Sequence, residues 1–202
     1  MSKTIIAIVG TYRKGGVIDT AVNEVLKAAQ TAGVQTSKIY LIDKRIEFCT
    51  NCRACLQQPG PARGICRHND DMAVILDCVD SADGLVIASP VNYYNVTAIT
   101  RRFLERLVVY GYWPWGQGVP KFRITDSGKK AVLVTSFAAP AFIGKIFFRP
   151  ALTALKAIAQ CFGAKVIARL YFGLVAQQPD STLNKKDLAR AYNAGLKLAH
   201  GI

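Results

Sequence analysis

Acidic residues are scarce in this sequence of 202 residues, which contains 13 Asp and Glu but 26 Lys and Arg. The formal net charge is therefore +13 at pH 7. Such an excess favours anionic partners, but it does not distinguish nucleotides from nucleic acid or lipid. Charged residues make up only 19% and hydrophobic residues 51%, which excludes disorder for the bulk of the chain. At roughly 100–200 residues per domain, we expect a single domain over residues 1–202.

Long hydrophobic runs and targeting signals are also missing. The apolar run Thr4–Val9 is too short for a signal peptide, and no small-residue cleavage site follows it. The longest uncharged stretch, Gly84–Thr100, contains a proline and two asparagines, whereas a membrane span needs about 20 predominantly apolar residues. No signature of a nucleic-acid-binding module accompanies the basic charge. We therefore expect a soluble, cytoplasmic protein that binds neither nucleic acid nor membrane.

Short β-branched runs alternate with amphipathic helical patterns along the chain. The runs that predict strands are Ile5–Val9, Lys38–Ile42, Leu85–Ala88, Ala131–Thr135 and Val166–Phe172, and helical spacing covers residues 21–29, 72–79, 99–110, 151–162 and 188–199. Asn69 and Thr97 are expected to cap the second and third helices, and Pro150 fits the first turn of the fourth. This alternation predicts an α/β fold: a flavodoxin-like three-layer sandwich whose five-stranded parallel sheet has the order 2-1-3-4-5, with helices on both faces.

Two connections are too long for simple strand-to-helix turns. One is a cysteine-containing insertion at about residues 43–69, and the other is an aromatic loop at about residues 111–129 that holds Trp113 and Trp115. Loops of this length are usually functional or disordered.

The turn from Gly10 to Gly16 lies between the first strand and the first helix, where a parallel sheet binds its ligands. A helix start offers unpaired backbone N–H groups and a partial positive charge. The candidate phosphate ligands are the hydroxyls of Thr11 and Thr20, the guanidinium of Arg13, and the backbone at Gly15 and Gly16. The turn matches neither GxxxxGK[ST] nor GxGxxG, so it does not indicate a nucleoside triphosphatase or a standard dinucleotide fold. The alternative is a glycine-rich turn that binds nothing.

The residues Gly10-Thr11-Tyr12-Arg13 resemble the Gly-Ser-x-Arg loop of the flavodoxin-like NADPH-dependent FMN reductase family, with Thr in place of Ser. The resemblance spans roughly residues 3–172. It implies FMN as the cofactor, with its phosphate at this loop, and NADPH or NADH as the electron donor. Where many members have Asn-Thr at the first helix, this chain has Asp19-Thr20, and we expect Asp19 to cap the helix rather than to meet the phosphate.

The segment after the third strand is similar to the family's Ser-Pro-x-Tyr stretch, whose main chain runs along the flavin. It supplies the predicted flavin ligands Pro90, Val91, Asn92, Tyr93, Tyr94 and Asn95. A flavin ring needs an apolar, aromatic wall and backbone hydrogen bonds, which this segment can provide. The family places its fourth-strand loop at the pyrimidine side of the ring, which adds Ser136 and Ala138. The alternative is a strand end with surface tyrosines.

Four cysteines are clustered as Cys49-x2-Cys52-x2-Cys55, followed after ten residues by Cys66. Iron–sulfur clusters and tetrahedral zinc both use four such ligands. The run resembles that of the iron–sulfur flavoproteins, a neighbouring branch whose last gap is shorter. Three alternatives stay open: a [4Fe–4S] cluster, a zinc ion, and free or redox-active thiols. The nearby arginines are expected to lower the thiol pKa values, and they are Arg45, Arg53, Arg63 and Arg67.

These patterns predict an FMN-dependent NAD(P)H oxidoreductase that passes electrons to a small acceptor such as a quinone, a flavin, a nitro compound or a metal ion. The flavin carries the chemistry, so no catalytic side chain is assigned. Trp113 and Trp115, from this or a partner subunit, are candidates to wall the open flavin face. The alternatives are an iron–sulfur flavoprotein that transfers electrons through the four cysteines, and a flavin-binding redox sensor. The resemblance implies a homodimer or homotetramer, and the apolar Tyr110–Trp115 segment suits an interface.

Overall fold

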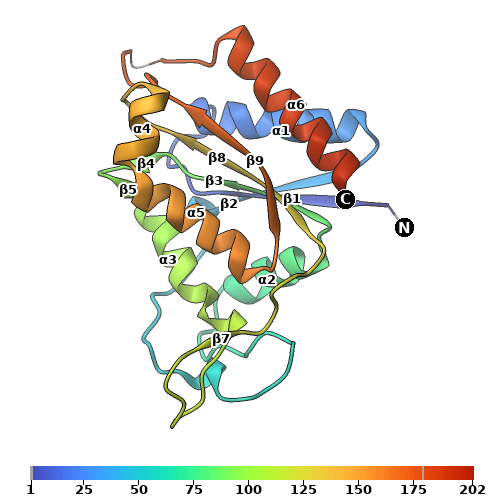
Figure 1. Cartoon of the computed structure of the whole chain (residues 1–202), viewed down its shortest axis with the longest axis vertical. Coiled ribbons are helices and arrows are strands. Elements are labelled where there is room, and N and C mark those ends of the chain that lie inside the picture. The colour runs from blue at the N-terminus through green and yellow to red at the C-terminus, as the bar shows by residue number, and fades with distance from the viewer. Residues whose placement is uncertain (1, 179) are drawn as a thin grey trace.

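The computed structural model describes residues 2–178 and 180–202, and a five-stranded parallel sheet lies at its centre (Figure 1). The order of its strands is β2-β1-β3-β8-β9. The strands are β1 (Thr4–Val9), β2 (Gln35–Tyr40), β3 (Gly84–Ala88), β8 (Lys130–Ser136) and β9 (Lys165–Phe172). Numbered along the sheet alone, this order is 2-1-3-4-5, so the predicted flavodoxin-like topology is confirmed.

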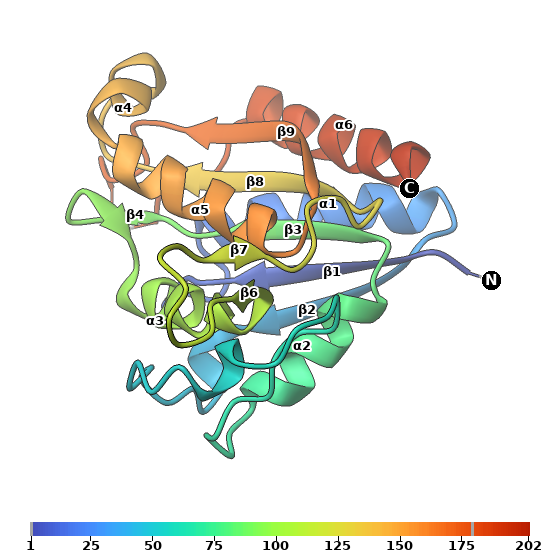
Figure 2. The same ribbon diagram turned by 60° about the horizontal axis from the view of Figure 1, so that its bottom comes forward.

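Helices cover both faces of the sheet and bury an apolar core on each. α1 (Val17–Thr31) and α6 (Lys185–Gly201) cover one face. α2 (Met72–Ser81), α3 (Ala98–Arg106) and α5 (Arg149–Cys161) cover the other (Figure 2). Because side chains alternate along a strand, Leu85 and Ile87 enter the second core while Val86 enters the first. A strand buried on both faces reads as a continuous apolar run, which is why the sequence revealed it.

The predicted starts of the third and fourth helices are confirmed. The side chain of Thr97 accepts a hydrogen bond from the Thr100 amide at the start of α3, and Pro150 lies in the first turn of α5. The expected N-cap Asn69 is wrong, because α2 begins two residues later and its N-cap is Asp71. The carboxylate of Asp70 accepts from the Met72 amide at 3.1 Å, and so it satisfies a free N–H of that helix start instead.

Several short elements escaped the sequence patterns. The hairpins β4 (Val91–Asn92) with β5 (Asn95–Val96), and β6 (Gly111–Tyr112) with β7 (Lys121–Phe122), have strands of two residues each. Helix α4 (Ala141–Phe147) follows Pro140, and the 3-10 turns are η1 (Leu41–Asp43), η2 (Ala54–Leu56) and η3 (Leu107–Tyr110). Elements this short carry too few residues for a periodic pattern.

The two long connections lie side by side below the sheet in Figure 1, and we call residues 43–69 the cysteine segment and residues 111–129 the aromatic segment. The Trp113 amide donates to the Leu56 carbonyl at 3.0 Å. The guanidinium of Arg123 donates to three carbonyls, those of Cys55, Gly60 and Gly111. The two segments therefore fold as one lobe. Within the described residues, no helix combines the length and the apolar character that a membrane crossing requires.

Candidate functional site at the carboxyl edge of the sheet

A cavity of about 250 Å³, which we call the cradle cavity, opens where β1, β3 and β8 end. It is lined by Thr11, Tyr12, Arg13, Gly16, Val17, Ile18, Pro90, Val91, Asn92, Thr97, Ser136, Val175 and Ser181. Three loops that the sequence placed after separate strands therefore meet at one edge, because the carboxyl ends of parallel strands point the same way.

The turn after β1 is tied firmly to β3 and α3. The Gly10 amide donates to the Ala88 carbonyl at 2.8 Å, and the Thr97 hydroxyl donates to the Gly10 carbonyl at 2.6 Å. A Cβ at Gly10 would lie 1.8 Å from the Thr100 Oγ1, so only glycine fits there. Thr97 both caps α3 and fixes this turn.

Asp19 holds the rest of the turn from behind. Its carboxylate accepts from the Gly15 amide, the Lys38 ammonium and the Tyr40 hydroxyl, each at 2.7 Å. Burial would raise the pKa of Asp19, but these hydrogen bonds outweigh burial and hold the pKa below its ordinary value. The N-cap of α1 is Gly16, without a side-chain cap bond, so the expectation that Asp19 caps this helix is wrong. The Asp19 carboxylate is instead neutralised on the side facing β2.

The lining of the cradle cavity carries donors suited to a phosphate. Thr11 accepts from the Arg13 amide at 3.2 Å, which leaves its hydroxyl proton available to a ligand. The first turn of α1 presents backbone N–H groups and the positive end of the helix dipole. Gly15, with φ at 77°, makes the reversal that brings the chain into α1.

A second cavity of about 350 Å³, which we call the ring cavity, shares Val91 with the cradle cavity. Its wall is apolar and aromatic: Tyr93, Tyr94, Phe137, Ala138, Ala139, Ile143, Phe147 and Phe148. The rings of Tyr94 and Phe148 are 5.8 Å apart, and those of Phe137 and Phe148 are 5.5 Å apart. A cavity lined in part by hydroxyl and guanidinium groups therefore adjoins one with an aromatic wall.

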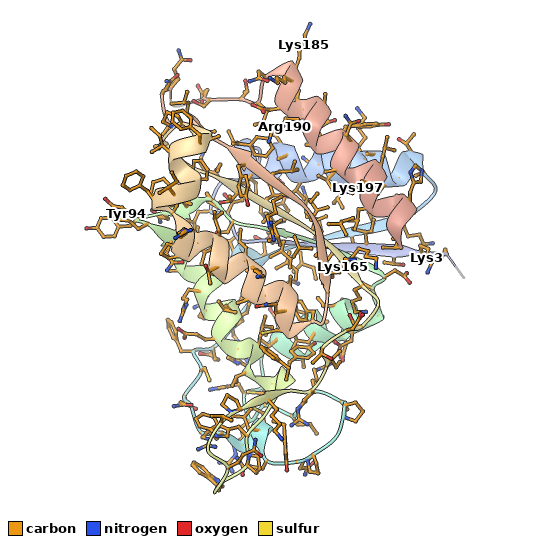
Figure 3. The ribbon with its side chains drawn as sticks, viewed as in Figure 1. Lys3, Tyr94, Lys165, Lys185, Arg190 and Lys197 are labelled. Atoms are coloured by element: carbon orange, nitrogen blue, oxygen red, sulfur yellow. The ribbon has the colours of Figure 1, made fainter. Side chains whose placement is uncertain are left out.

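The turn of the β4–β5 hairpin is strained. Both of its central residues have positive φ, 45° at Tyr93 and 68° at Tyr94, where glycine or asparagine is usual. Figure 3 shows Tyr94 projecting away from the body of the sheet. Strained backbone of this kind collects at functional sites, so the observation favours a role for these two rings.

Most of the predicted cofactor residues line one cavity or the other, and three line neither. Thr11, Arg13, Gly16, Pro90, Val91, Asn92 and Ser136 line the cradle cavity, and Tyr93, Tyr94 and Ala138 line the ring cavity. Gly15 supports the turn, the Thr20 hydroxyl lies 3.4 Å from the Gly15 carbonyl, and the Asn95 side chain accepts from the Val96 amide.

Sequence reasoning missed other lining residues. Val175 and Ser181 come from the connection between β9 and α6, and Ile18 comes from α1. That connection carries no sequence motif. Its position after the fifth strand, at the same edge of the sheet, is the feature from which its place in the cavity could have been predicted.

The four clustered cysteines lie in the lobe. Burial, and then the three neighbouring thiols, raise the pKa of Cys55 to about 11. The exposed Cys52 differs, because the Ala54 amide lowers its pKa against a slight effect of burial, and Arg67 contributes less. Over residues 2–178 and 180–202, no three or more His, Cys, Asp or Glu side chains are arranged to hold a metal ion. Within this part of the chain, the four thiols are therefore not preassembled as metal ligands.

The arginines near the cysteines have partners of their own. Arg53 lies between Trp113 and Trp115, 3.9 Å and 4.1 Å from their ring centres. Arg63 pairs with the carboxylates of Asp77 and Asp80. The expectation that these arginines activate the thiols is therefore wrong for Cys55. The tryptophans line neither the cradle cavity nor the ring cavity of their own chain.

The model of the NADPH-dependent FMN reductase family matches residues 4–174. The chain belongs to this family. It is 34% identical over 113 residues to an iron–sulfur flavoprotein of Archaeoglobus fulgidus, covering 56% of this chain and 49% of that protein. An iron–sulfur flavoprotein of Methanocaldococcus jannaschii is 32% identical over 102 residues, or 50% of each chain. The chain thus spans about half the length of these relatives.

Solved structures of other oxidoreductases share the fold. An NAD(P)H:quinone oxidoreductase from Methanothermobacter marburgensis superposes with a TM-score of 0.75 at 17% identity, over 99% of this chain and 98% of that one. An FMN-dependent NADH-azoreductase from Bacillus anthracis, in complex with FMN, gives 0.68 at 13% identity over 98% of both chains. At these identities the likeness concerns the fold alone.

The donors of the cradle cavity and the aromatic wall of the ring cavity match what membership in this family implies, because FMN carries a phosphate at one end and a flat apolar ring at the other. Thr11, Arg13 and the start of α1 would hold the phosphate, and the β4–β5 hairpin with the α4 region would hold the ring.

Proposed function

We propose that this chain is an FMN-dependent NAD(P)H oxidoreductase that passes electrons from a nicotinamide cofactor to a small acceptor. The observation that carries the proposal is the union of the cradle cavity and the ring cavity at Val91, in a chain of the FMN reductase family. Bound FMN supplies hydride acceptance and electron release, and the protein supplies position and electrostatics.

The chain's own residues do the binding. Charge-assisted hydrogen bonds contribute about 1.5–3 kcal/mol each, so Arg13, the Thr11 hydroxyl and the α1 amides together can retain a phosphate against its hydration. Asp19 keeps the turn in place while its charge is neutralised by Lys38, 2.7 Å away. The hairpin main chain from Pro90 to Asn92 lies beside both cavities and orients whatever spans them.

The ring cavity is open on its outer side. Tyr93 is 93% exposed and Phe147 is 64% exposed, so a nicotinamide or a flat acceptor can stack there in turn. Quinones, free flavins and nitro compounds are flat and suit this site, whereas a metal ion would accept electrons without stacking. One shared stacking site gives ping-pong kinetics.

The test of this proposal is spectroscopic. FMN added to apo protein should lose its fluorescence at a stoichiometry of one, and NADPH or NADH added without oxygen should bleach the bound flavin. A quinone should then restore the flavin colour. Failure of FMN to bind, or failure of either nicotinamide to bleach bound FMN, would overturn the proposal.

A second candidate is an iron–sulfur flavoprotein acting as an electron-transfer module through Cys49, Cys52, Cys55 and Cys66. Its support is the likeness to iron–sulfur flavoproteins and the mutual influence of the four thiols on the Cys55 pKa. Protein purified without oxygen would be assayed for iron and acid-labile sulfide. About four of each per chain would establish this candidate, and the absence of both would remove it.

The homo-oligomer expected from the resemblance has a candidate surface beside the ring cavity. Phe142, Ile146 and Phe147 of α4 are all exposed. Tyr93, which lines the ring cavity together with Phe147, is exposed to a greater extent. Contiguous apolar side chains of this kind mark interaction sites. We propose that a second copy covers α4 and closes the ring cavity. Light scattering should give a dimer or tetramer for the parent chain and a monomer after Phe142→Ser and Phe147→Ser together, whereas a monomeric parent would refute the idea.

A further inference from the structure

A third cavity, of about 430 Å³, lies on the other face of β8 from the cradle cavity, and we call it the α5–β9 cavity. Thr135 and Ser136 are neighbours in β8, but alternation turns the first towards α5 and the second into the cradle cavity. The α5–β9 cavity is lined by Leu133, Thr135, Arg149, Leu152, Thr153, Leu155, Lys156, Arg169 and Tyr171. It shares no lining residue with the cradle cavity or the ring cavity.

The charged side chains that line the α5–β9 cavity are all cationic. Arg149, Lys156 and Arg169 line it, and its lining holds no Asp or Glu. Arg63 and Arg106, by contrast, are both paired with carboxylates. Throughout residues 2–178 and 180–202, no ion pair engages any of the three cavity cations. α5 also begins here without an acid in its first turn, so its dipole adds to the positive potential.

A buried hydroxyl is left without a partner at the same place. Thr135 is 1% exposed, and its Oγ1 finds no hydrogen-bond partner among the described residues. A buried polar atom without a partner is unfavourable, and most such atoms in proteins are satisfied by protein, water or ligand. The hydroxyls of Thr153 and Tyr171 line the cavity beside it. Burial raises the pKa of Tyr171 despite the opposing charge of Arg169, so this phenol keeps its proton and remains a donor.

The floor of the cavity is apolar. Leu133 and Leu155 are buried in the core and face into the cavity from β8 and α5. A cavity of this size, with an apolar floor and a few polar groups, matches a site for a small organic molecule.

We propose that the α5–β9 cavity binds a small organic anion, with an apolar body on the leucines and a phosphate or carboxylate among Arg149, Lys156, Arg169 and the Thr135 hydroxyl. The α5–β9 cavity shares no lining residue with the cradle cavity or the ring cavity, so the anion should bind without displacing the flavin. The site is an addition to the proposed redox function and does not depend on it.

The test uses the full chain loaded with FMN, so that the cradle cavity is filled. 1-Naphthyl phosphate, 1-naphthol and inorganic phosphate would be titrated separately by calorimetry. Naphthyl phosphate should bind once per chain and more tightly than inorganic phosphate, and naphthol should show no saturable binding. Lys156→Gln with Arg169→Gln should weaken binding of naphthyl phosphate at least tenfold, the loss expected from removing one or more charge-assisted bonds.

Two further variants locate the site. Lys165→Gln removes the same charge from β9 outside the cavity (Figure 3) and should leave the affinity unchanged. Thr135→Val keeps the shape of the side chain and should weaken binding several-fold without lowering the urea midpoint. The proposal fails if naphthyl phosphate does not bind at about 10 mM, if all variants bind equally, or if binding releases FMN.

Discussion

The carboxyl edge of the sheet and the lobe use similar residues in opposite ways. At the edge, the cradle cavity is lined by the hydroxyl residues Thr11, Ser136 and Ser181 and by the start of α1, and it opens to solvent. Where the lobe joins α2 and α3, arginines and acids pair with one another. Arg106 pairs with Asp70, and their side chains are 2% and 1% exposed. A cavity of about 590 Å³ lies there too, but its Arg63 and Tyr110 are both held by Asp80.

The two regions differ in whether their polar groups are paired with each other or line an open cavity. Polar groups that satisfy one another fix a structure, whereas polar groups presented to an open cavity are available to a ligand. The proposed ligand site therefore lies at the edge, and the ion pairs beside the lobe are interpreted as structural.

The largest effect is expected from Arg106→Leu, at the end of α3 where the lobe joins the sheet domain. Arg106 binds both carboxylate oxygens of Asp70, the Glu47 carbonyl and the Cys66 thiol, the last at 3.3 Å. Removing one partner of a buried pair leaves a buried charge, so the free energy of unfolding in urea should fall by about 3–5 kcal/mol. Affinity for FMN should not change in the fraction that remains folded.

Two controls separate the buried pair from its helix. Arg101→Gln, which breaks the exposed pair with Glu105 on the same helix α3, should lower stability by about 0.5 kcal/mol at most. Asp70→Leu combined with Arg106→Leu should lower stability by less than the sum of the single changes. A small effect of Arg106→Leu would mean that the lobe is not fixed by its ion pairs.

The second prediction concerns the thiols. Because the pKa of Cys55 is about 11 and that of Cys52 is below its ordinary value, Cys52 should react with iodoacetamide at pH 8 about a hundred times faster. The rate at Cys55 should still rise about tenfold per pH unit between pH 8 and 10, since its thiolate fraction grows until pH 11. The Cys52 rate should level off earlier. Mass spectrometry of the labelled peptides measures both, and equal rates would contradict the buried environment of Cys55.

The third prediction concerns the edge. Arg13→Gln should weaken FMN binding by about 10- to 100-fold, the effect of one charge-assisted hydrogen bond. The adjacent Lys14 pairs with Asp43 at 2.7 Å and does not line the cradle cavity, so Lys14→Gln is the matched control and should leave the affinity unchanged. Fluorescence titration measures both. Equal losses would indicate a general effect of charge rather than a phosphate site.

The sequence predicted the sheet because its three central strands are buried on both faces, as in Ile5–Val9. It indicated the site edge because the turns after those strands carry glycine and hydroxyl residues. It did not predict the lobe. The stacking of Arg53 between Trp113 and Trp115 joins residues about sixty positions apart and follows no periodic pattern. It also did not reveal the α5–β9 cavity. In the sequence, the basic residues that line this cavity have the spacing of an ordinary solvent-exposed helix face and strand.

The smallest effect is expected at the strained hairpin. Tyr93→Asn places a residue that tolerates positive φ at the turn, so the free energy of unfolding should rise by about 0.5–1 kcal/mol. If the strain serves to present the ring, kcat/KM with a quinone should fall about two- to tenfold, the worth of one aromatic contact. Leu174 also has positive φ, at 59°, but lies outside both flavin cavities. Leu174→Asn should gain the same stability with no loss of turnover, and equal behaviour of the two variants would show that the hairpin's strain has no bearing on electron transfer.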